Sequence, residues 1–173
     1  MYARALGAAR LGKVSAAKKD VARLTALKTA MQEGKQFYWV DQADIQIQTV
    51  NAWIARADGK SKEALRLLRK AADHEDGTEK SAVTPGPIIP VREQLGDMLM
   101  AMKQPREALT EYQRAIIKEP NRFRSLYAAA RAAEAIKDQG TAQKYYEQLL
   151  ASANNPQGIH PETQHAKQYL ARR

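Results

Sequence analysis

One helical pattern recurs along this chain and limits what it can fold into. Its clearest copy reads Leu95-Gly96-x-x-Leu99, then Ala108-x-x-x-Tyr112-x-x-Ala115, then Pro120. Spacings of three and four place such residues on one face of each of two successive helices. Gly96 and Ala108 are small enough to let the two helices approach closely, while the larger side chains fill the groove beside them. The pattern therefore predicts antiparallel helix pairs that stack on one another.

The same frame occurs three more times, each copy beginning at an anchoring alanine. The copies are Ala142-x-x-x-Tyr146-x-x-Leu149, Ala64-x-x-x-Leu68-x-x-Ala71 and Ala17-x-x-x-Val21-x-x-Leu24. The step from Ala64 to Ala108 is longer than the step from Ala108 to Ala142, and three prolines between residues 84 and 90, which cannot continue a helix, account for the excess. We therefore expect hairpins over about 1–35, 37–75, 90–120 and 121–153, with a Pro-rich connection over 79–90.

The segment from Val91 to Pro120 resembles a tetratricopeptide (TPR) repeat, whose pattern is W-x2-L-G-x2-Y, then A-x3-F, then P, with a period of about 34 residues. The step from Ala108 to Ala142 equals this period. Arg92 stands in place of the Trp, and Leu99 and Tyr112 replace the Tyr and Phe. The runs VTPGPIIPVREQLGDML and PNRFRSLYAAARAAE also resemble the C-terminal part of larger bacterial TPR proteins, a likeness that implies no activity.

The resemblance implies an all-α, right-handed α-solenoid of about four hairpins in one domain over 1–173. A final helix over about 160–171 is expected to cap the stack. Glycines and polar residues indicate where the helices begin and end. Gly12 and Gly59 each lie five residues before an anchoring alanine, where a hairpin turn belongs. Ser15, Ser61 and Asn121 are the expected N-caps of the helices that follow them.

The charge of the chain is basic and uneven. The formal net charge is +9; residues 1–36 contribute +6 and residues 121–173 contribute +4. A solvated basic face, an acidic partner or nucleic acid would each fit this distribution. A nucleic-acid surface would be carried by the basic residues of the first hairpin, namely Lys13, Lys18, Lys19, Arg23 and Lys28.

The sequence contains no signal for a membrane or a compartment. No apolar run reaches the roughly 18 residues of a membrane-spanning helix, and the first residues lack the apolar core of a signal peptide. The absence of cysteine excludes disulfides and leaves the compartment open. Because a helix follows Met1 at once, where a repeat stack usually opens with a polar cap, we expect the chain to be a fragment of a larger protein.

The TPR resemblance implies a binding groove lined by the first helix of each hairpin. The residues it places there are Gln46, Thr49, Trp53, Arg56, Glu93, Asp97, Met100, Arg124, Tyr127, Arg131 and Glu134. The aromatic rings of Trp53 and Tyr127, with arginine guanidinium groups around them, would suit a peptide that carries carboxylates. Alternatively, Trp53 packs under the neighbouring hairpin and the arginines pair with Glu93, Asp97 or Glu134.

Two other observations restrict the function. The basic-and-asparagine set by which some TPR domains hold a C-terminal carboxylate is not reproduced, which argues against binding of chaperone tails. No nucleophile motif, phosphate loop or metal-ligand spacing is present; His74-Glu75-Asp76 lies at a helix end, and His160 and His165 are five residues apart. We therefore expect a non-enzymatic module without cofactor or metal that binds a protein or peptide segment. A nucleic-acid surface and a structural, self-associating piece are the alternatives.

Overall fold

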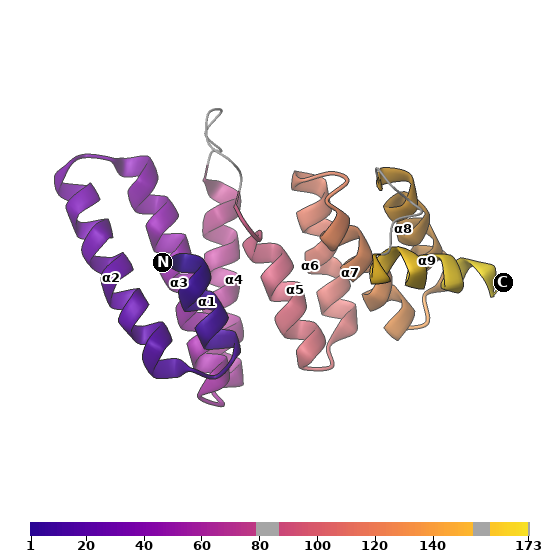
Figure 1. The fold of residues 1–173 in the computed structure, drawn as a ribbon, viewed down its shortest axis with the longest axis horizontal. Helices are drawn as coiled ribbons and strands as arrows, with labels where there is room; N and C mark the ends of the chain where they lie inside the picture. Colours follow the sequence, from indigo (N-terminus) through magenta and orange to yellow (C-terminus); the bar gives the residue numbers. More distant parts are fainter. Residues whose placement is uncertain (79–86, 154–159, 173) are drawn as a thin grey trace. The chain divides into compact units, whose positions relative to one another are not determined.

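The computed structural model describes residues 1–78, 87–153 and 160–172, and within these ranges the regular structure is entirely α-helical (Figure 1). The described chain gathers into two compact units, residues 1–91 and residues 92–173. Part of the Pro-rich connection predicted over 79–90 lies outside the described residues, as do residues 154–159. The prediction of an all-α chain is confirmed.

The first unit consists of four helices, each packed on the next. Helix α1 (Tyr2–Arg10) contacts both α2 (Val14–Glu33) and α3 (Phe37–Ala57), and α4 (Ser61–Gly77) packs along α3. Figure 1 shows α2 and α3 running side by side. The turns at Gly12 and Gly59 have φ of +72° and +77°, which glycine adopts without strain, so both predicted turns are confirmed.

The second unit is built of helices as well. Its helices are α5 (Val91–Ala101), which begins at the last residue of the first unit, α6 (Pro105–Lys118), α7 (Phe123–Ala135), α8 (Gln139–Ser152) and α9 (Pro161–Ala171). Helix α7 packs between α6 and α8, and α9 packs on α8. Ala166 of α9 is fully buried, and the ring of Tyr169 lies 4.9 Å from that of Tyr146, so both residues pack α9 against α8.

The small residues of the repeated pattern lie at close helix contacts. Ala17, Ala64, Ala108 and Ala142 all have 0% exposed surface. A Cβ atom added to Gly96 would lie 2.4 Å from the ring of Tyr112, closer than any real contact, so only glycine fits. The prediction that Gly96 and Ala108 mark a close approach of two helices is confirmed.

The predicted N-caps are wrong. Helix α2 already begins at Val14, Ser61 is the first residue of α4, and neither α2 nor α4 has a side-chain cap. Asn121 adopts a left-handed conformation with φ of 63° in the turn before Arg122, which is the N-cap of α7. The turns lead directly into the following helix, so the serines fall inside the first turn and cannot cap it.

Candidate functional site

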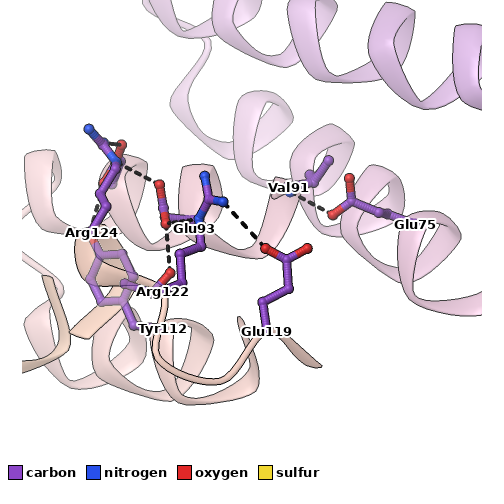
Figure 2. Close-up of polar contacts among 9 residues, drawn as sticks. Glu75, Val91, Glu93, Tyr112, Glu119, Arg122 and Arg124 are labelled. Atoms are coloured by element: carbon purple, nitrogen blue, oxygen red, sulfur yellow. Dashed lines mark hydrogen bonds and ion pairs between the residues drawn. The ribbon is translucent and has the colours of Figure 1, made fainter. Parts of the chain in front are cut away.

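A buried carboxylate on α5 holds the start of α7 in place. Glu93 has no exposed surface and accepts hydrogen bonds from Arg122 Nε (3.0 Å), Arg124 Nε (2.6 Å) and Ser125 Oγ (2.6 Å) (Figure 2). Arg122 also pairs with Glu119. A buried charge is tolerated only when it is paired and hydrogen-bonded, as this one is. The alternative prediction that the arginines pair with neighbouring acids is confirmed for Arg124.

Asp97 continues this network one turn further along α5. It pairs with Arg124 and accepts a hydrogen bond of 3.0 Å from the hydroxyl of Tyr112. Burial and the Asp97 charge raise the pKa of Tyr112, which therefore stays protonated and remains a donor. These bonds keep the Arg124 side chain at a fixed position although half of it is exposed.

A pocket of about 440 Å³ opens beside this network, within the second unit, and is called the second-unit pocket below. Its lining residues come from α5, α6, α7 and α9 and are Asp97, Met100, Tyr112, Phe123, Arg124, Tyr127, Ala128, Arg131 and Glu162. The volume falls within the usual range for ligand pockets. The structure therefore brings together five of the predicted groove residues: Asp97, Met100, Arg124, Tyr127 and Arg131.

A second polar cluster lies next to this pocket, between α7 and α9. Glu134 accepts a hydrogen bond of 2.9 Å from Tyr146 and lies 3.3 Å from Arg131 Nη1. His165 Nε2 lies 3.0 Å from Arg131 Nη1 and 3.2 Å from a Glu134 oxygen. Partial burial would raise the pKa of Glu134, but the hydrogen bonds from Tyr146 and His165 and the charge of Arg131 outweigh it and lower the pKa. Glu134 therefore supports the wall of the pocket through Arg131.

The predicted groove residues of the first unit do not form a comparable site. Thr49 has no exposed surface, and its hydroxyl donates to the Ile45 carbonyl 2.8 Å away. Trp53 is 8% exposed and lies under the Arg10 guanidinium, 4.6 Å from the ring centroid. The alternative prediction, that Trp53 packs under the neighbouring hairpin, is the one confirmed. Gln46 and Arg56 are half-buried.

An apolar hollow of about 330 Å³ lies elsewhere in the first unit. It is lined by Gln46 and mainly by apolar side chains, among them Leu24, Leu27, Met31, Tyr38, Trp39 and Ile88. Leu27, Trp39 and Ile88 keep 45%, 46% and 68% of their surface exposed. Leu24 of the same wall is 7% exposed, so the side of the hollow formed by α2 is partly buried.

Four residues of the second-unit pocket were not predicted as part of a groove: Tyr112, Phe123, Ala128 and Glu162. Tyr112 was predicted only as a packing residue of the repeated pattern, the pattern does not include Phe123 or Ala128, and Glu162 belongs to α9. The N-terminal end of α9 reaches α7, where the ring of His165 lies 6.0 Å from that of Tyr127. Only the packing of α9 reveals that Glu162 lines the pocket, because the repeated pattern does not include α9.

In comparisons with known proteins, the chain matches no protein-family model, no curated protein and no solved structure. The TPR resemblance therefore stays an expectation from the repeated pattern.

Two searches of the described residues bear on the site. They contain no group of three or more His, Cys, Asp or Glu side chains arranged to hold a metal ion. None of their helices combines the length and apolar character that crossing a membrane requires.

Proposed function

We propose that this chain is a non-enzymatic interaction module that receives a segment of a protein partner in the second-unit pocket. The observation that carries the proposal is the pocket itself, which gathers Met100, Phe123 and Tyr127 beside charged groups held by ion pairs. Aromatic side chains with a few fixed polar groups are typical of protein-binding hot spots. The two clusters around Glu93 and Glu134 fix the walls before a ligand arrives, which lowers the entropic cost of binding.

A random peptide library displayed on phage tests this proposal. The full chain is used for selection, and the selected peptides are measured against wild type and against Met100→Glu, which places a charge in the pocket. We expect the variant to weaken binding at least tenfold. Ile117→Glu is the matched control, because Ile117 lies on α6 with 78% of its surface exposed and does not line the pocket. Circular dichroism verifies that both variants keep their helix content. Peptides that bind all three proteins equally would refute the pocket assignment.

A nucleic-acid surface is the second candidate. Lys13, Lys18 and Lys19 are exposed and pair with no carboxylate among the described residues. However, Arg23 lies 3.8 Å from Asp20 and Lys28 pairs with Asp44, so part of the predicted patch is neutralised. Titration with duplex and single-stranded oligonucleotides at low salt decides this candidate, since phosphate contacts are strongest there. No binding at low salt would exclude it.

Self-association is the remaining candidate. The exposed Leu27, Trp39 and Ile88 around the apolar hollow favour it, because uncovered apolar patches promote association. Light scattering over a range of concentrations tests it. A mass that stays at one chain throughout would exclude it.

A further inference from the structure

The arginines of the second-unit pocket are already engaged by carboxylates of the chain itself. Arg124 donates through Nε to Glu93 and through Nη2 to Asp97, and Arg131 Nη1 lies against Glu134. If Arg124 turned toward a ligand carboxylate, the buried Glu93 would lose one of its two guanidinium partners. Breaking a buried ion pair costs more than a new exposed pair returns. A peptide carboxylate, the ligand group that the sequence suggests, would therefore gain little binding free energy in this pocket.

Glu162 is the acidic group of this pocket that remains available. It lines the pocket from the first turn of α9, and the described part of the chain gives it no hydrogen bond or ion pair. The surroundings are acidic as well. The charged groups that line the pocket, or bond directly to one that does, include the carboxylates Glu93, Asp97, Glu134 and Glu162 and the guanidinium groups of Arg124 and Arg131, and the His165 imidazole lies 3.0 Å from Arg131 Nη1.

The excess negative charge favours a cation in the pocket. Among the groups named here, four carboxylates outnumber two arginines, and adding Arg122 together with Glu119 leaves this difference unchanged. Because the pocket is partly enclosed, its charges are screened less than those on an open surface. A positively charged side chain would therefore be attracted to this pocket and a carboxylate would be repelled.

The walls of the pocket suit a long basic side chain. Phe123 and Tyr127 present aromatic rings, and Met100 adds a polarisable thioether. Arginine and lysine bury their aliphatic stems against apolar surface while their charged ends reach a polar group. An aromatic ring also attracts a cation placed over its face.

From these observations we infer that the pocket recognises its partner through an arginine or lysine side chain, which packs against Phe123 and Tyr127 and pairs with Glu162. This inference rests on the proposed function and names the chemistry of the segment that the pocket receives.

The library selection described above tests the inference when the selected peptides are sequenced. Peptides that lose affinity for Met100→Glu are expected to share an Arg or Lys at one position. Replacing that residue with citrulline or norleucine should weaken binding at least tenfold. Glu162→Gln should weaken binding of the unmodified peptide at least fivefold and make its affinity less dependent on salt concentration. Glu147→Gln is the matched control, because Glu147 is an exposed glutamate of α8 outside the pocket and should leave the affinity unchanged.

The outcomes separate the inference from the proposal on which it rests. Pocket-dependent peptides that share an Asp or Glu, or only apolar residues, would overturn the inference and leave the interaction module standing. A selection without any pocket-dependent peptide would overturn both. A charge exchange adds an independent criterion: Glu162→Lys should recover affinity for a peptide whose basic anchor is replaced by Glu. Equal weakening of basic and acidic peptides by this variant would show that Glu162 acts on the structure alone.

Discussion

The hydroxyl of Tyr146 on α8 donates a hydrogen bond of 2.9 Å to the carboxylate of Glu134 on α7. Tyr112, which holds the same position in the preceding copy of the repeated pattern, donates in the same way to Asp97 on α5, across 3.0 Å. Both tyrosines are buried, and burial together with the neighbouring carboxylate raises the pKa of each. The repeat therefore preserves a polar contact between the two helices of a hairpin as well as its apolar packing, although the carboxylate comes from a different position of the first helix.

The lowered pKa of Glu134 makes the second unit sensitive to acid. The unfolded chain binds this proton at about pH 4.5, whereas the folded chain binds it only at lower pH. The contribution of the Glu134 carboxylate to the free energy of unfolding is therefore fully present above about pH 4.5. It is lost as the pH falls through the pKa that Glu134 has in the folded chain. Glu134→Gln should lower the stability at pH 7 and make it less dependent on pH below 5. Urea unfolding at several pH values measures this. If the free energy of unfolding depends on pH below 5 in the same way in wild type and in Glu134→Gln, this prediction is wrong.

Gly96→Ala should destabilise the protein. The added methyl group would lie 2.4–2.7 Å from the ring of Tyr112, which is 2% exposed and has little room to move. Overpacking of this kind costs about 1–3 kcal/mol, more than alanine returns through its helix propensity. Gly7→Ala is the control, because Gly7 lies within α1 with no atom within 4 Å of an added Cβ. It should stabilise by about 0.5–1 kcal/mol in thermal unfolding. Equal effects of the two substitutions would refute the packing account.

Glu93→Gln should destabilise the second unit by about 3 kcal/mol, because the substitution breaks a buried ion pair. It leaves Arg122 and Arg124 without their shared carboxylate and places an amide in a fully buried site. Glu63→Gln is the matched control, because the Glu63–Arg66 pair is exposed on α4 and should leave denaturant unfolding unchanged. A loss for Glu93→Gln as small as that of the control would show that the buried network contributes no stability.

The two tryptophans should respond differently to a quencher. Trp39 is 46% exposed, whereas Trp53 is 8% exposed beneath Arg10. In Trp39→Phe, the remaining emission should be blue-shifted and poorly quenched by acrylamide. In Trp53→Phe, the emission should be red-shifted and quenched several times more strongly. Similar quenching of both variants would contradict the burial of Trp53.

Local spacing explains what the sequence could predict. The anchoring alanines are buried as expected because residues three, four and seven apart share a face of any helix. Trp53 is buried because α1 packs on α3 and Arg10 lies over its ring, and Thr49 is buried as well, so neither position lines an open wall. Glu162 could not be found at all, because its place in the pocket depends on how α9 packs against α7.

A chemical-shift map recorded with a library-selected peptide is the most direct test of the proposed binding pocket. The peptide is added to isotope-labelled protein, and the changes are followed residue by residue. Binding in the second-unit pocket should place the largest changes on the pocket residues Met100, Phe123, Tyr127, Ala128, Arg131 and Glu162. Changes confined to residues 1–91, with the signals of these six residues unmoved, would contradict it.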